Sequence, residues 1–337
     1  MSFEVLRAGV LTTVQDLGRY GMQHVGVPVS GAMDAYSLRV ANRLVGNDDE
    51  AAALEITLAG PLLAFLADTL LALCGGDLSP TIGGKRVPMR RPVIISRGSQ
   101  LVFGECAAGC RAYLAVAGGI DVPEVLGSRS TYVRAAIGGV HGRALKSGDR
   151  LVAAKTNQHR FAELSESPAY VRDGFAAARW SVQGNPERFL RRPQEIRFVA
   201  GSQWDTLTLA ARDLFTSENF RLGSASDRMG YRLEGARLEG AVGTDRGTIA
   251  SEAVAFGTIQ LPADGNPIVL MADRQTIGGY PRIGEVASVD LSLLAQLKPG
   301  DKLAFRQISL PEAQDLVHAQ ERALARISEA VKMRLQQ

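Results

Sequence analysis

Residues 145–151 read Leu-Lys-Ser-Gly-Asp-Arg-Leu, and residues 297–303 repeat the pattern as Leu-Lys-Pro-Gly-Asp-Lys-Leu. In each half of the chain the pattern follows an apolar stretch and a glycine pair, at 118–119 and 278–279, by a similar interval. Such self-similarity is typical of two related domains, although the chance recurrence of one short turn would look the same. We predict two similar domains, because 337 residues are a natural length for two.

Most of the chain reads as short strands broken by Gly, Pro and Asp, as at 93–96, 112–116 and 267–271. Closely spaced strands of this kind are typical of β-barrels or sandwiches, so the predicted class is mainly β. Helical spacing occurs at 33–45, and again after Ser309, which forms a capping box with Glu312. The predicted domains are 1–190 and 191–308, followed by a C-terminal helix over 309–337. A polar connection at 156–193 would hold one further helix, near 168–178.

Composition and charge limit the classes of function. Hydrophobic residues make up 46% and charged residues 22%, as in an ordinary globular protein, and the net charge of +3 is too small to indicate nucleic acid or a membrane surface. The most apolar stretch, 61–74, is too short to span a bilayer, and the first residues lack a signal peptide's apolar region. Three cysteines suggest neither a disulfide framework nor a zinc site, and fit a reducing cytoplasm.

Standard catalytic motifs are missing from the sequence. There is no Gly-x-x-x-x-Gly-Lys-Ser/Thr phosphate loop, no Gly-x-Gly-x-x-Gly turn and no Gly-x-Ser-x-Gly elbow. If the chain handles ATP, it does so without a Walker loop, and no metal site is expected.

The most suggestive segment is 267–282, in which an apolar strand delivers Asp273 and Gln275 at its end. Polar groups at the end of a rigid strand are well placed to fix a ligand. Carboxylates can accept from the N–H groups of a planar amide, while arginine or a glutamine amide donates to its oxygen. The same residues have a plainer interpretation, because neighbouring Asp and Arg often form surface ion pairs or turn contacts.

Two other segments are dense in polar residues, 12–34 and 226–233. The second contains Asp227 and Arg228, which suit the same amide chemistry. In the first, Gln15, Asp16 and Ser30 are better explained as groups that satisfy loop backbone or cap the first helix.

These segments together resemble the allophanate hydrolase subunit 2 / 5-oxoprolinase C-subunit family, which is related to the carboxyltransferase domain of urea carboxylase. The similarity runs in order from about residue 4 to about residue 306. It is carried by 12–19 (TTVQDLGR), 30–34 (SGAMD), 53–57 (ALEIT), 113–123 (YLAVAGGIDVP), 227–233 (DRMGYRL) and 267–282 (PIVLMADRQTIGGYPR).

The resemblance implies a fold of two cyclophilin-like β-barrels and a role as the C subunit of an ATP-dependent 5-oxoprolinase that opens 5-oxoproline to glutamate. It implies two partners, a smaller family-related subunit of the B type and a sugar-deacetylase-like subunit of the A type. The candidate catalytic residues are then Asp227, Arg228, Asp273 and Gln275. The candidate substrate-binding residues are Gln15, Asp16, Arg19, Tyr231, Gly278, Gly279, Tyr280 and Arg282.

Two alternatives stay open. One is a biotin-dependent carboxyltransferase or allophanate hydrolase-type subunit that acts on urea or a related amide, with biotin as a cofactor carried by another protein. The other is a non-catalytic protein that binds a kinase inhibitor. If the chain is a 5-oxoprolinase subunit, ATP is consumed by the complex, and the isolated chain is expected to be inactive.

Overall fold

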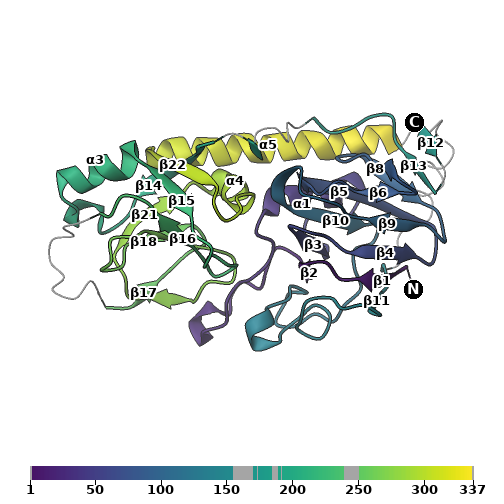
Figure 1. The fold of residues 1–337 in the computed structure, drawn as a ribbon, viewed down its shortest axis with the longest axis horizontal. Helices are drawn as coiled ribbons and strands as arrows, with labels where there is room; N and C mark the ends of the chain where they lie inside the picture. Colours follow the sequence, from purple (N-terminus) through teal and green to yellow (C-terminus); the bar gives the residue numbers. More distant parts are fainter. Residues whose placement is uncertain are drawn as a thin grey trace. The chain divides into compact units, whose positions relative to one another are not determined.

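A computed structural model describes residues 2–154, 170–172, 174–183, 189–190, 192–238 and 250–335. It is mainly β, which confirms the predicted class, and it divides into two compact units (Figure 1). Unit 1 comprises Met1–Gly18, Asp34–Arg188 and Arg322–Gln337, and unit 2 comprises Arg19–Met33 and Phe189–Glu321. Within the predicted first domain, 1–190, the segment Arg19–Met33 thus groups with unit 2.

Unit 1 contains two sheets whose strands are mostly antiparallel neighbours. The first has the order β11 (Arg150–Leu151), β1 (Phe3–Arg7), β4 (Leu62–Phe65), β9 (Gln100–Val102), β6 (Thr81–Ile82) and β7 (Lys85–Arg86). The second has the order β12 (Tyr170–Arg172), β13 (Phe175–Ala177), β8 (Pro92–Ile95), β5 (Thr69–Asp77), β10 (Ala108–Val116), β3 (Ala53–Thr57) and β2 (Leu11–Gln15). A short 3-10 helix, η2, spans Val133–Ala135.

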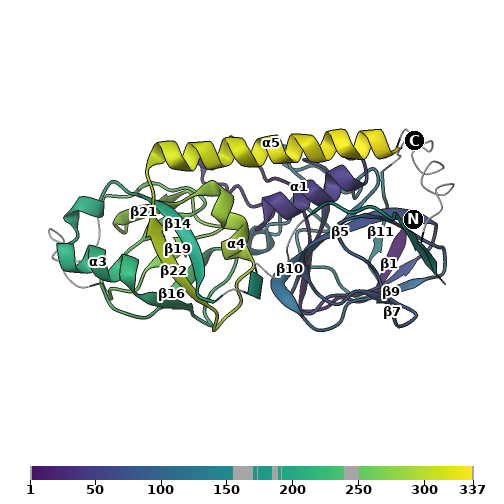
Figure 2. The same cartoon turned by 90° about the horizontal axis from the view of Figure 1, so that it is seen from above.

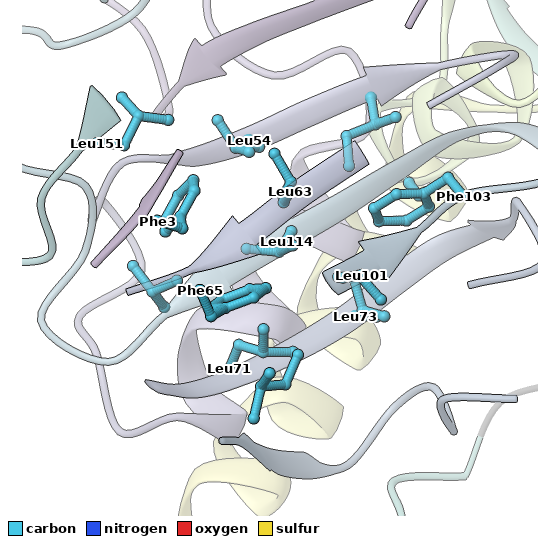
Figure 3. Packing of buried hydrophobic residues seen from close by; sticks show 14 of the residues in the cluster. Phe3, Leu54, Leu63, Phe65, Leu71, Leu73, Leu101, Phe103, Leu114 and Leu151 are labelled. Carbon is cyan, nitrogen blue, oxygen red and sulfur yellow. The ribbon is translucent and has the colours of Figure 1, made fainter. Parts of the chain in front are cut away.

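The core of unit 1 lies between these sheets (Figure 3). Alternate residues of each strand point into it, as Phe3 and Val5 do from β1 and Leu63 and Phe65 from β4. The rings of Phe3 and Phe65 lie 5.6 Å apart, centroid to centroid. Their burial ties the N-terminal strand to the sheet.

Helix α1 (Ala35–Leu44) lies against β5 and β10, as Figure 2 shows. Asp34 caps its N-terminus by accepting a hydrogen bond from the Ser37 amide at 2.9 Å. Gly46 follows the helix with φ 74°, a backbone region that glycine adopts without strain. The helix predicted over 33–45 is therefore confirmed.

The helix predicted over 168–178 is wrong, because β12 and β13 form a hairpin there. Phe175 is buried and pairs with Ile95 of β8, so the segment gains more from extending a sheet than from a helix. Gly174, at φ 90°, lies in the turn. Residues 156–169, 173, 184–188 and 191 of the predicted connection lie outside the described residues.

Unit 2 is built on a closed barrel. Its order is β14 (Gln194–Ala200), β21 (Arg282–Val286), β18 (Thr258–Gln260), β19 (Ile268–Leu270), β16 (Gly230–Glu234), β15 (Asn219–Leu222) and β22 (Lys302–Gln307). Around it lie α3 (Leu209–Ser217), α4 (Leu291–Ala295), the 3-10 helices η1 (Gln23–Val25), η4 (Trp204–Thr206) and η5 (Ser288–Asp290), and a ribbon of β17 (Glu252–Ala253) and β20 (Ile277–Gly278).

Aromatic rings fill one part of the barrel core. Phe215 of α3 stacks on Phe305 of β22 at 4.5 Å, and meets Phe198 of β14 edge-on at 5.1 Å. Such pairs contribute roughly 0.5–1.5 kcal/mol beyond the area they bury. They fix α3 against the barrel.

The C-terminal helix α5 spans Leu310–Leu335. Its start agrees with the predicted capping box, because the Glu312 amide donates to Ser309 Oγ at 3.2 Å. No helix in the described part of the chain is long and apolar enough to cross a membrane.

The repeated turn has the same conformation in both units. Asp149 Oδ2 accepts from the Lys146 amide at 2.7 Å, and Asp301 Oδ2 accepts from the Lys298 amide at 3.0 Å. The glycine before each aspartate is left-handed, with φ 89° at Gly148 and 91° at Gly300. The matching geometry supports the predicted relationship between the two domains.

We expect Gly148→Ala and Gly300→Ala each to lower the free energy of unfolding by about 1–2 kcal/mol, because an L-residue is strained at this φ. A Cβ at either position meets nothing within 4 Å, so the loss would come from the backbone alone. Denaturant unfolding measures it. Gly104→Ala is the control, because Gly104 has ordinary φ and its Cβ would meet nothing closer than 3.4 Å. Equal stability of all three variants would contradict the left-handed conformation of Gly148 and Gly300.

Candidate functional site

A buried ion pair joins two of the predicted catalytic residues in unit 2. Asp273 follows β19 and Arg228 precedes β16, and these strands pair at Gly230 and Leu270. Arg228 Nε lies 2.9 Å from Asp273 Oδ2, and its Nη2 lies 3.0 Å from Oδ1. The residues are only 7% and 6% exposed, so the pair is well shielded from water. Bidentate geometry of this kind is the strongest form of carboxylate–guanidinium contact.

The same pair holds the end of the segment Arg19–Met33. Ser30 Oγ donates to Asp273 Oδ1 at 2.6 Å, and its amide donates to the Ala272 carbonyl at 3.1 Å. Arg228 Nη2 also donates to the Gly31 carbonyl at 2.6 Å. Ser30 is left-handed at φ 59°, which these contacts stabilise.

The hydrogen bonds already made by Asp273 and Arg228 limit what the pair can do. The Asp273 carboxylate accepts three hydrogen bonds from Arg228 and Ser30, two of them from a cation. The geometry therefore suits Asp273 and Arg228 to positioning the loop, and direct contact with a substrate stays a prediction.

The other predicted residues of these segments have different surroundings from one another. Asp227 is exposed, and its Oδ1 accepts from the amides of Met229 at 2.8 Å and Gly230 at 3.3 Å, which closes a turn. Tyr231 is buried in the barrel core. Gln275 is half-buried.

The predicted glycine–tyrosine segment forms β20 and the turn after it. Gly278 is packed so closely that a Cβ would lie 2.4 Å from Gln260 Nε2. Gly279 is half-buried and Tyr280 is exposed. Arg282 is tied to the ribbon, since its Nη2 lies 2.8 Å from Glu252 Oε2 and its Nη1 donates to the Ala253 carbonyl at 3.2 Å.

The predicted N-terminal residues divide between the units. In unit 1, the Asp16 carboxylate accepts from the Gly18 amide at 2.8 Å, the Arg129 amide at 2.5 Å, and the hydroxyls of Ser128 and Ser130. Asp16 thus fixes the turn around 128–130, as the structural interpretation of this segment predicted.

Gln15 and Arg19 are both fully buried. Gln15 belongs to unit 1, where its Nε2 donates to Thr13 Oγ1 at 3.0 Å and to the Thr131 carbonyl at 3.1 Å. Arg19 belongs to unit 2, where its amide donates to the Val29 carbonyl at 2.8 Å. These two predicted substrate-binding residues are therefore described in different units.

A buried polar network in unit 1 was missed by the sequence reasoning. Tyr113 donates to Glu55 Oε2 at 2.7 Å and accepts from the Asp34 amide at 2.7 Å. Burial, followed by the charges of Glu55 and Asp34, raises the pKa of Tyr113 well above its usual 10.0. The cross-strand pairing of Tyr113 with Glu55 is not visible in the sequence, because it joins β10 to β3.

A second missed group lies on the barrel of unit 2. Glu285 Oε2 accepts from Thr258 Oγ1 at 2.9 Å, yet burial raises the pKa of Glu285 above its usual 4.5. Burial also lowers the pKa of Arg274. Perturbed groups of this kind gather at functional sites more often than elsewhere. The sequence signal for this group was the alternation of polar and apolar residues at Thr258, Ile259 and Gln260.

The described residues hold no group of three or more His, Cys, Asp or Glu side chains arranged to bind a metal ion.

Comparisons with known proteins place the chain among carboxyltransferase-like proteins. Residues 25–307 match the family described as "Carboxyltransferase domain, subdomain A and B". The chain is 40% identical to the C subunit of 5-oxoprolinase from Escherichia coli over 92% of both sequences, and 34% identical to that of Haemophilus influenzae over 93% of both.

Urea amidolyases are similar over one part of their length. The chain is 36% identical to urea amidolyase of Lachancea kluyveri, covering 96% of this chain but 18% of the enzyme. The crystal structure of the K. lactis urea amidolyase has a TM-score of 0.83 and 33% identity over 97% of this chain, which spans 20% of the enzyme.

We expect Asp273→Asn to cost about 3–5 kcal/mol of unfolding free energy, because it leaves the Arg228 cation buried and uncompensated. Replacing both residues, as Arg228→Met with Asp273→Leu, should recover much of that loss. Glu195→Gln is the control: Glu195 pairs with Arg306 on the surface, where the change should stay below about 1 kcal/mol. Equal losses for Asp273→Asn and Glu195→Gln in denaturant unfolding would rule out this role.

We expect Glu285→Gln to stabilise the protein at neutral pH. The folded-state pKa of Glu285 is raised by burial, so the folded chain binds more protons than the unfolded chain just above pH 4.5. Wild-type stability therefore falls as pH rises through this range, and the glutamine variant should lack that part of the fall. Stability curves from about pH 4.5 to about pH 8 measure the difference. Parallel curves for the two proteins would show that Glu285 titrates normally.

Proposed function

The chain belongs to the family of the carboxyltransferase domain, subdomains A and B, and on that premise we propose that it is the C subunit of an ATP-dependent 5-oxoprolinase, which opens 5-oxoproline to glutamate. The observation that carries the proposal is the end-to-end match to the C subunit of a bacterial 5-oxoprolinase, with 92% of each sequence covered. The match to urea amidolyase covers less than a fifth of that enzyme.

The chemistry of a lactam agrees with the groups in unit 2. A lactam is a planar amide whose carbonyl carbon is protected by resonance, so opening it requires its oxygen to be stabilised as it gains negative charge. The proposed site still comprises Asp227, Arg228, Asp273 and Gln275. Given its contacts, we assign the Arg228–Asp273 pair to holding the Ser30 turn, and leave the nucleophile and the general base unassigned.

We assign ATP to the complex rather than to a site in this chain. Phosphate binding at a helix start uses free backbone amides, and at α1 the Asp34 carboxylate already accepts from the Ser37 amide. The sequence contains no Walker loop. ATP would activate the lactam for attack, and we derive no step for it from these residues.

The proposal includes two partner subunits, a smaller one of related fold and a sugar-deacetylase-like one. The existence of partners is supported by both bacterial relatives, each of which is one subunit of a 5-oxoprolinase. The chain alone is then expected to be inactive. Three free cysteines, at Cys74, Cys106 and Cys110, suit the cytoplasmic location that we propose.

The second candidate is a biotin-dependent carboxyltransferase acting on urea or a related amide. The fold similarity to urea amidolyase, at a TM-score of 0.83, favours it. This function would require carboxybiotin supplied by another protein, and therefore activity that avidin blocks.

The test is reconstitution. The chain is co-expressed with the two partner subunits from the same source, and glutamate release from 5-oxoproline is followed with and without ATP. We expect ATP-dependent release by the complex and none by this chain alone, and no effect of avidin. A full complex that releases no glutamate with ATP would contradict the proposal, and avidin-sensitive, bicarbonate-dependent ATP turnover with urea would favour the second candidate.

A further inference from the structure

The outer face of the barrel in unit 2 carries a covered polar strip. Thr258 of β18 pairs with Glu285 of β21, and Gln260 pairs with Arg282 after a β-bulge. Ile259, between them, lies in the barrel core, so Thr258 and Gln260 point away from it. Both are nevertheless buried, with Gln260 only 1% exposed.

The ribbon of β17 and β20 covers this strip. Gly278 of β20 packs against Gln260 Nε2, and the Val254 amide after β17 donates to the Thr276 carbonyl at 3.2 Å. Arg282 ties the ribbon to the barrel through Glu252. The backbone of the ribbon therefore covers the strip, and Gly278 is the residue that lies against the Gln260 side chain.

Gln260 Nε2 has no hydrogen-bond acceptor among the described residues, although it is buried. Burying an amide N–H without an acceptor is costly, and most buried polar groups are paired for that reason. An unpaired donor in a polar strip is explained if its acceptor arrives with a ligand.

Arg274 is a second, cationic donor, and it contacts the residue that follows β17. It is 8% exposed, and no carboxylate of the described residues lies within ion-pair distance of it. Its Nε reaches the Val254 carbonyl only at 3.5 Å, and its Cζ lies 5.9 Å from the Phe256 ring. The neighbouring arginine, Arg228, shows the contrast, because its charge is met by Asp273.

The contacts connect the two donors. The Val254 carbonyl accepts a hydrogen bond from Arg274 Nε. The Val254 side chain lies beside Gly278, which covers Gln260 Nε2. Tyr20, Glu285 and Asp273 act electrostatically on Arg274, and the Glu285 carboxylate accepts a hydrogen bond from Thr258 Oγ1 at 2.9 Å. A buried cation that makes no ion pair among the described residues therefore contacts Val254, and a buried amide N–H without an acceptor lies beside Gly278 of the same ribbon.

We propose that Arg274 and Gln260 bind the carboxylate of a small acidic ligand beneath the β17–β20 ribbon. A guanidinium presents N–H groups in a planar fork that matches a carboxylate, and the amide N–H supplies a further donor. For the identity of the acid the inference rests on the proposed function, in which it is the carboxylate of 5-oxoproline. Recognition of that group would separate this acid from neutral lactams.

Binding to the full chain is measured by calorimetry at constant ionic strength, with 5-oxoproline, acetate, the neutral lactam 2-pyrrolidinone and inorganic phosphate as probes. We expect saturable binding of 5-oxoproline, weaker binding of acetate at the same site, and no saturable binding of 2-pyrrolidinone or phosphate. Arg274→Gln should weaken 5-oxoproline binding by about tenfold to a hundredfold, as expected for a charge-assisted contact. The surface variant Arg306→Gln should leave it unchanged.

Gln260→Met gives a second, opposite readout. Methionine keeps the length of the side chain and removes the unpaired N–H, so the variant should have a higher Tm than wild type without ligand, while it binds 5-oxoproline less tightly. A variant that merely misfolds would lower both quantities. A lower Tm, or unchanged affinity, would mean that the amide is not a ligand donor.

The outcomes separate this site from the function proposed above. Equal affinity of wild type and Arg274→Gln for the acids, equal binding of 2-pyrrolidinone, preference for phosphate, or no saturable binding of any acid would overturn the site. If acetate binds in an Arg274-dependent way and 5-oxoproline does not, the site stands and the 5-oxoprolinase assignment fails. If the complex releases glutamate normally with Arg274→Gln, the function stands without this site.

Discussion

The arrangement of unit 2 depends on the buried ion pair of Arg228 and Asp273. Each residue stands next to a strand of the barrel. Arg228 contacts Gly31, 197 residues earlier in the sequence, and Asp273 contacts Ser30, 243 residues earlier. Removing charge from water is expensive, so such a pair persists only where geometry and further hydrogen bonds are nearly complete. Here they are, and the left-handed Ser30 is held as a consequence.

This constraint also explains why Arg274 makes no ion pair with the aspartate before it. It follows Asp273 directly, but the Asp273 carboxylate is committed to Arg228 and Ser30. Burial then lowers the pKa of Arg274. A structural ion pair beside a cation that makes no ion pair among the described residues suits an anion site, because the first fixes the backbone and the second can contact the ligand.

The sequence predicted those parts of the fold that depend on local rules. The capped helices at 35–44 and 310–335 and the Gly-Asp turns at 148–149 and 300–301 follow from side chains within a few residues of each other. The failure at 170–177 has the opposite cause, since Phe175 is extended only because β8 is available to pair with it. Unit 2 closes into a barrel, whereas the strands of unit 1 form two sheets, a difference set by long-range pairing.

The site, like the fold, was predictable from the sequence only in part. Asp273 and Arg228 were identified because polar residues at strand ends indicate a site, but their partnership with Ser30 could not be read from spacing. Asp227 and Tyr231 differ from their predicted surroundings, since one closes a turn and the other fills the core. Gln260 and Glu285 were missed because their surroundings depend on the pairing of β18 with β21, which puts Thr258 opposite Glu285 and, after a bulge, Gln260 opposite Arg282.

Binding of the acidic lactam under the β17–β20 ribbon of unit 2 is tested most directly by amide hydrogen exchange. The full chain is compared with and without saturating 5-oxoproline. We expect ligand-dependent protection within 252–260 and 274–285, and none at the turn 145–151 of unit 1. Protection confined to unit 1, or no change anywhere in the chain, would contradict this assignment.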